Sequence, residues 1–305
     1  GSSPSFPSAK TRRIGEKGAS KVVGEVWRIG DVKISRIVEI EATGGMPRIL
    51  TDARREKVVA IRWLYPHFAD EEGRMRGAIH ALLVETPDMS ILVDTCIGND
   101  KERSVPAWNH LQTGFLNDLK SAGKGREEID RVLCTHLHTD HVGWNTMWTG
   151  SEWVPTFPNA RYLYGAKEFN FWRENAEDGQ AQVMQDSVLP VWDAGLVDLV
   201  EQDAEICPGI TLIPSPGHTP GHASVLIESA GQSALITGDV LHHPVQMAHP
   251  EWSSSPDVDR PQAVQTRKTM YNRFADGPTL IIGTHFATPT AGYIKKDGDA
   301  WRLEV

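Results

Sequence analysis

The segment Thr135–His141, which reads THLHTDH, constrains this chain more than any other feature of its sequence. It directly follows a short apolar run that is typical of a buried strand. Residues two apart in an extended chain point to the same side, so His136 and His138 can bind one ion together. If the chain then turns into a helix, Asp140 and His141 reach a neighbouring point. Imidazole and carboxylate ligands suit zinc and similar metals, so the segment predicts two adjacent metal positions.

Three later segments each end an apolar run with small residues and a candidate ligand. They are PGHTPGH at 216–222, TGD ending at Asp239 and GTH ending at His285. A single His or Asp at the end of a strand is usually structural. Three of them, in order after THLHTDH, make coincidence a poor explanation. The sequence therefore predicts that several strand ends meet at one site.

Short apolar strands alternate with helical segments in two similar halves of the chain. The pattern predicts a hairpin around Gly30-Asp31 and a final hairpin with Asp297-Gly298 at its turn. Helices are expected at 48–60, 111–122, 166–176, 182–192 and 257–275. This is the pattern of an α/β protein with helices covering its sheets. No linker divides residues 22–305, so we expect a single domain there. Residues 1–21 are expected to be a flexible tail that begins with the scar of a protease cleavage.

Composition excludes several classes of protein. With 305 residues, 40% hydrophobic and 23% charged, the chain is too apolar and too mixed to be disordered. No apolar run approaches the roughly 20 residues of a membrane span, and a net charge of −9 disfavours a nucleic-acid partner. The three cysteines Cys96, Cys134 and Cys207 form neither a disulfide pattern nor a metal clip. They favour a reducing, cytoplasmic compartment, while a periplasmic or secreted location stays open.

The segments THLHTDH, PGHTPGH, TGD and GTH together resemble the metallo-β-lactamase superfamily of binuclear hydrolases. The resemblance is to its lactonase and methyl parathion hydrolase-like group. It implies a four-layer αβ/βα sandwich with two divalent metal ions at the sheet edge, zinc first, although Mn, Fe and Co accept the same ligands. It assigns His136, His138 and His222 to one metal, Asp140, His141 and His285 to the other, and Asp239 as the bridge between them.

Three further residues gain a role from the resemblance. Asp94 is expected to orient a metal-bound histidine, the alternative being a carboxylate that stabilises a turn at the strand end. His218 matches a motif residue and is interpreted as stabilising its turn rather than as a ligand. His242 stands three residues after the bridging Asp239, where N-acyl homoserine lactonases commonly carry a Tyr that helps to polarise the carbonyl. It is expected either to donate a hydrogen bond to the same oxygen or to pack in the pocket wall.

The expected reaction is hydrolysis by a hydroxide held between the two metals, with Asp140 orienting it and relaying a proton. We expect a small, neutral, apolar substrate: a lactone or ester, with aryl phosphotriesters as promiscuous substrates. Trp144 and Phe286 are expected to line the pocket. Amide or β-lactam hydrolysis is one alternative, and a non-catalytic binding scaffold is another, which the full ligand set disfavours. We expect no membrane partner, and we expect the protein to form a two-fold homodimer.

Overall fold

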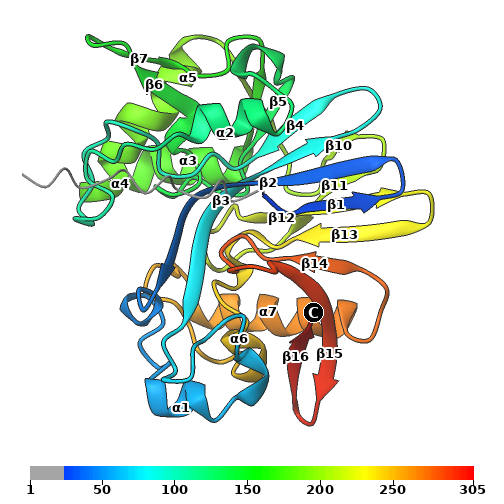
Figure 1. Ribbon diagram of the computed structural model, residues 1–305. Coiled ribbons are helices and arrows are strands. Elements are labelled where there is room, and N and C mark those ends of the chain that lie inside the picture. Colours follow the sequence, from blue (N-terminus) through cyan, green and yellow to red (C-terminus); the bar gives the residue numbers. More distant parts are fainter. Residues whose placement is uncertain (1–23) are drawn as a thin grey trace, which may run out of the picture.

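Two sheets lie face to face in the computed structural model, which describes residues 24–305 (Figure 1). The tail predicted at residues 1–21 lies outside the described range. The first sheet has seven strands in the order β1 (Val26–Ile29), β2 (Val32–Thr43), β3 (Arg76–Glu85), β4 (Ser90–Val93), β5 (Arg131–Leu133), β8 (Arg161–Gly165), β9 (Val197–Val200). The second also has seven, in the order β10 (Glu205–Cys207), β11 (Ile210–Pro214), β12 (Ala223–Ser229), β13 (Gln232–Ile236), β14 (Leu280–Ile282), β15 (Ala291–Asp297), β16 (Ala300–Glu304).

Helices cover the outer face of each sheet (Figure 1). The first sheet is covered by α2 (Phe115–Ser121), α3 (Ala166–Asn175) and a continuous stretch of α4 (Asp178–Val183), the π-helical η5 (Met184–Val188) and α5 (Leu189–Asp193). The second sheet is covered by α6 (Val245–Ala248) and α7 (Arg260–Phe274), with α1 (Arg55–Val59) beside them. Helix, sheet, sheet and helix make four layers, which confirms the predicted α/β sandwich.

Each sheet buries both of its faces, and its side chains alternate accordingly. In β3, Ala81 and Leu83 pack toward the helices, whereas Leu82 and Val84 pack in the core between the sheets. Successive side chains of a strand point to opposite faces, so an uninterrupted apolar run fills two cores at once. This is why the strand segments are apolar without the alternation seen when one face meets water.

Parallel pairing brings the candidate ligands to one edge. β4 pairs in parallel with β5, and β13 with β14. The carboxyl ends of parallel strands lie on the same side of a sheet. Asp94 directly follows β4, and His136 comes three residues after the end of β5. Asp239 and His285 come three residues after the ends of β13 and β14. The site is therefore positioned by the two rigid sheets.

Several predicted elements have different bounds. The helix expected at 48–60 is shortened to α1, preceded by the single turn η1 (Met46–Arg48). The last hairpin turns at 298–299, because Asp297 still pairs with Ala300. The separate hairpin of β6 (Thr146–Trp148) and β7 (Trp153–Pro155) was not predicted. Within residues 24–305, no helix is long and apolar enough to cross a bilayer.

Candidate metal centre

The Asp239 carboxylate lies at the centre of a buried cluster of imidazoles. It follows β13 in the short turn η6 (Gly238–Val240), and only 3% of its side chain is exposed. Its Oδ2 is 3.1 Å from His141 Nε2 and 3.2 Å from His242 Nε2. Its Oδ1 is 3.1 Å from His285 Nε2. Ring nitrogens thus face both oxygens, which is the placement expected of a bridging ligand.

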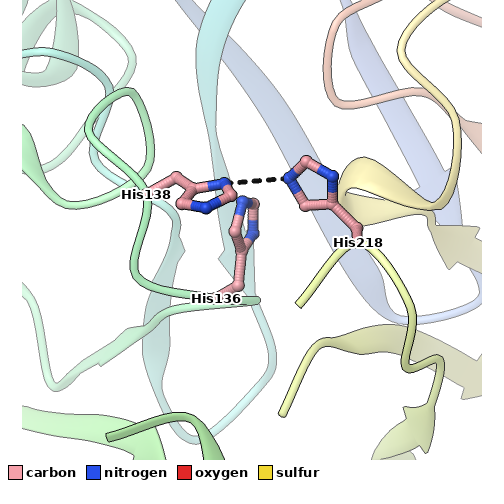
Figure 2. A group of neighbouring side chains, drawn as sticks. All are labelled: His136, His138 and His218. Atoms are coloured by element: carbon pink, nitrogen blue, oxygen red, sulfur yellow. Dashed lines mark hydrogen bonds between the residues drawn. The ribbon is translucent and has the colours of Figure 1, made fainter. Parts of the chain in front are cut away.

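Three imidazoles form the first candidate metal position, and Figure 2 shows their rings converging. His136 and His138 come from the loop after β5, and His218 from the loop after β11. His138 Nδ1 is 2.9 Å from His218 Nε2. Two nitrogens on one zinc ion, each at about 2.0–2.1 Å, lie roughly 3.4 Å apart, so a small adjustment admits the metal. The Nε2 atom of His136 is buried without a hydrogen-bond partner, which a metal would supply.

Asp140, His141 and His285 form the second candidate position. Asp140 Oδ1 is 3.6 Å from His141 Nε2, and its Oδ2 is 3.4 Å from His285 Nε2. His285 Nδ1 lies 2.9 Å from the carbonyl oxygen of Ala78, so Nδ1 carries the proton and Nε2 faces the centre. Asp140 is the most exposed of the three, with 15% of its side chain accessible. It is therefore the group placed to meet a molecule that enters from solvent.

His222 is not placed as a ligand, contrary to the prediction, because both of its ring nitrogens are already used. Nδ1 is 2.8 Å from Ser215 Oγ, and Nε2 accepts the backbone N–H of Asp239 at 2.8 Å. Burial and the neighbouring His218 lower the pKa of His222 to about 3, so the ring is neutral. A neutral imidazole has one ring-nitrogen lone pair that can accept a hydrogen bond or bind a metal, and in His222 this lone pair accepts the N–H of Asp239. His218, and not His222, joins His136 and His138 in the candidate position.

The turn that carries Asp239 requires glycine next to it. Gly238 has φ +56°, which L side chains rarely adopt. A Cβ atom at this position would lie 2.4 Å from His222 Nε2. Gly238 therefore leaves room for the His222 ring to accept the backbone N–H of Asp239.

A carboxylate orients one histidine in each position. Asp94 Oδ2 is 2.8 Å from His141 Nδ1, the placement predicted for Asp94, and the same side chain accepts the N–H and O–H of Thr135. Asp257 Oδ1 is 2.7 Å from His218 Nδ1. Such a carboxylate fixes the tautomer of a ligand imidazole and raises its basicity.

Asp257 was missed by the sequence analysis. The helix predicted at 257–275 included it, whereas α7 begins at Arg260, with Asp259 as its N-cap. Asp257 therefore lies in the preceding loop and is free to turn toward the centre. Ser254 donates to it through both its backbone N–H and its hydroxyl. The Ser-x-x-Asp spacing was the available signal, but it reads equally well as an ordinary turn.

His242 is brought to the edge of the centre, where it was predicted. It is 2% exposed, and its ring is parallel to that of His285, with centroids 5.7 Å apart. Its Nδ1 is buried without a hydrogen-bond partner. Burial lowers the pKa of His242 despite the attraction of Asp239, so the ring is neutral at pH 7. Its Nε2 faces Asp239 Oδ2 at 3.2 Å.

The two aromatic residues expected in the pocket are packed in the cores instead. Trp144 stacks on Phe115, with ring centroids 5.6 Å apart, and its Nε1–H donates to Glu39. Phe286 is fully buried and packs edge-on against Phe68. Proximity to a ligand in sequence was a poor guide here, because each ring turns away into the apolar layer behind its loop.

The two metal positions differ in their protonation. Burial and neighbouring imidazoles lower the pKa values of His136 and His138 well below the usual value, so both are neutral. Burial acts in the same direction on His141 and His285, but Asp239 and Asp140 outweigh it there. The pKa of His141 is raised well above the usual value, and that of His285 to about 9. Nitrogen and carboxylate donors of this kind fit two divalent ions such as zinc.

Comparison with known proteins gives a family. Residues 74–285 match the family described as the Metallo-beta-lactamase superfamily. An N-acyl homoserine lactonase of a Bacillus species is 28% identical over 166 residues, which are 50% of this chain and 60% of that protein. One from Bacillus thuringiensis is 27% identical over 173 residues, 52% of this chain and 62% of that protein. The chain thus aligns with less than two thirds of the length of these curated relatives.

Solved structures resemble nearly the whole chain. The hydrolase AbOPH of the beta lactamase superfamily is 26% identical, with a TM-score of 0.75, over 93% of this chain and 98% of that one. AidC, a dizinc quorum-quenching lactonase, is 19% identical, with a TM-score of 0.77, over 92% of this chain and 96% of that one, a likeness of fold. The family match covers more than half of the chain and includes every residue of both candidate positions. This protein is therefore a member of the metallo-β-lactamase superfamily.

Proposed function

We propose that this protein is a hydrolase with two divalent metal ions that opens lactones or cleaves neutral esters. His136, His138 and His218 would hold the first ion. Asp140, His141 and His285 would hold the second, and Asp239 would contact both. The observation that carries the proposal is the central Asp239 carboxylate, which is faced by ring nitrogens from both positions.

Two divalent ions held by these residues, most simply zinc, would supply Lewis acidity and would lower the pKa of a water molecule enough to provide a nucleophile at neutral pH. Asp140 is the most accessible carboxylate of the centre. It would orient the attacking water, accept a proton from it and pass that proton to the leaving group. His242 lies 3.2 Å from Asp239 Oδ2 at the same centre, and it would donate its N–H to the substrate oxygen as negative charge develops there. No serine nucleophile is needed, so no covalent intermediate on the chain is expected.

The substrate class rests on the relatives. The aligned curated proteins are named N-acyl homoserine lactonases, and AidC is titled a lactonase. Hydrolysis of a lactone needs a nucleophile at the carbonyl carbon and a proton for the departing alkoxide. The proposed centre would supply both. Aryl phosphotriesters are proposed as promiscuous substrates and an amide or β-lactam as the second candidate, because a metal-activated water would attack a phosphoryl group or an amide carbonyl in the same way.

The test compares an N-acyl homoserine lactone, an aryl phosphotriester and a β-lactam side by side, following proton release or chromophore release. Metal-stripped protein and the protein reloaded with zinc are the controls. The proposal expects the lactone to be turned over fastest, with the rate lost on stripping and restored on reloading. A β-lactam turned over fastest would select the second candidate. No turnover of any substrate by protein that holds two metals would overturn the proposal.

The role of His242 is tested separately by His242→Phe and His242→Tyr. Phenylalanine keeps the ring but offers no donor, and loss of such a donor costs about 10²-fold in kcat or more. Tyrosine restores a donor and should recover most of that loss. Equal rates for the two variants would assign His242 to packing.

A further inference from the structure

Glu168 is a buried carboxylate that the centre described above does not use. It lies in the first turn of α3 and is 1% exposed. Glutamate is almost never fully buried unless it is paired, and none of the ion pairs among residues 24–305 includes Glu168. A carboxylate in this position needs hydrogen-bond donors in place of a countercharge.

The donors come from both loops that form the first metal position. Glu168 Oε1 accepts the backbone N–H of Leu137 at 3.1 Å, and Leu137 lies between the two histidines of the THLH segment. Glu168 Oε2 accepts the backbone N–H of Gly221 at 3.1 Å, and Gly221 is in the PGHTPGH loop with His218. One side chain thus connects the loop after β5 to the loop after β11.

Glu168 is also connected, through Trp172, to the imidazole ring of His138 in the first metal position. The indole of Trp172, one turn further along α3, donates from Nε1 to Glu168 Oε1 at 2.7 Å. The same indole packs against the ring of His138 in a tilted arrangement, with ring centroids 5.4 Å apart. Glu168 therefore fixes the indole that supports the His138 ring.

The second loop approaches α3 so closely that only glycine fits. A Cβ atom on Gly221 would lie 2.2 Å from the backbone nitrogen of Glu168. The loop backbone is therefore seated directly on the first turn of the helix. Such close seating makes the loop position sensitive to any change in the Glu168 side chain.

We propose that Glu168 is a positioning residue that sets the spacing between His138 and His218, and thereby the metal affinity of the three-imidazole position. The inference rests on the proposed two-metal centre. All three of its partners are donors, so the ionised carboxylate matches them and an amide does not. In Glu168→Gln, the NH₂ group must face at least one of these donors, and the two loops lose their common anchor.

The experiment measures zinc binding to the metal-free protein by competition with a chelator of known affinity, and also follows the absorption bands of bound Co²⁺. Glu168→Gln is compared with Glu174→Gln, an exposed glutamate on the same helix. Loss of an outer contact to a ligand typically weakens metal binding 10- to 100-fold, roughly. We expect that loss in Glu168→Gln for one of the two ions, with less than about a threefold change for the other, and no change in Glu174→Gln.

A second variant keeps the test open if Glu168→Gln does not fold. Trp172→Phe retains an aromatic ring against His138 but removes the N–H that binds Glu168. It should weaken the same ion by a smaller factor and shift its Co²⁺ bands. Equal weakening of both ions, or affinities equal to those of Glu174→Gln, would overturn the proposal and leave Glu168 a general packing residue. Wild-type protein that binds fewer than two ions would instead count against the proposed function.

Discussion

The two candidate metal positions both lie against Asp239 but are built from different donors. The first has three imidazoles, and burial keeps His136 and His138 neutral, with their lone pairs available. The second has Asp140 and two imidazoles whose pKa values the carboxylates raise, so protons occupy it when no metal is bound. A metal ion must displace protons from His141 and His285 but not from His136 or His138. We therefore expect the first position to load before the second, and more independently of pH.

The largest effect is expected where the two positions meet. Asp239→Asn removes the charge that both ions share, so both affinities should fall and hydrolysis should drop by about 10³-fold or more. Metal content after dialysis and the lactone rate are the two measurements. Asp299→Asn, an exposed change in the last turn, is the matched control. Two retained ions at full rate would remove Asp239 from the role of bridge.

The next effect separates the two histidines of PGHTPGH. His218→Ala should empty the first position and lower the rate about 10²- to 10³-fold, while the second position keeps measurable affinity. His222→Ala should retain both ions and instead lower the free energy of unfolding by about 1–3 kcal/mol, because the Asp239 N–H loses its buried acceptor. The reverse pattern, with metal lost from His222→Ala alone, would restore the assignment made from sequence.

A smaller effect is expected from the two orienting carboxylates. Asp257→Asn should weaken the first ion, and Asp94→Asn the second, each by roughly 10- to 100-fold. Chelator competition on the two variants measures this directly. If each variant weakened both ions equally, the two positions would behave as one unit rather than as two.

The smallest effect concerns protons in the metal-free protein. The pKa of His285 is raised to about 9, above the value near 6.5 of an unfolded chain. Its contribution to stability is therefore complete below about pH 6.5 and is lost as the pH rises through about 9. His222, with a pKa of about 3, acts in the opposite sense and costs stability as the pH falls below about 6.5.

Urea unfolding of metal-free protein across this range tests both signs, with His285→Gln as the variant that should flatten the alkaline side. Nuclear magnetic resonance titration of the imidazoles gives the individual values. A His285 ring that titrates near 6.5 would show that the carboxylates do not hold a proton at the second position.

How much could be predicted from the sequence differs between the two halves of the site. In the first half, four donors lie within the six residues 136–141, so local geometry alone indicated the two positions. In the second half, His218, Asp239 and His285 come from three separate strand ends and meet only through the pairing of the second sheet. The order of the motifs was enough to find these segments but not to decide between His218 and His222.

That decision depends on lone pairs, which sequence does not show. Both histidines are buried next to the centre, and only their partners differ: a carboxylate for His218 and a backbone N–H for His222. Asp257 was missed for a related reason, because its role depends on where α7 begins. The apolar pattern, in contrast, correctly predicted sheets covered by helices, because burial on both faces leaves a continuous signal in each strand.

The two sheets contribute donors to the same pair of ions, and this has a mechanical consequence. Residues 136–141 are attached to the first sheet, whereas His218, Asp239 and His285 are attached to the second. Bound ions would therefore cross-link the two sheets of the sandwich. A force that pulls the sheets apart would have to break coordination bonds before the apolar layer opens. The metal-loaded protein should therefore unfold at a higher pulling force than the metal-free protein, because the reaction centre also holds the two sheets together.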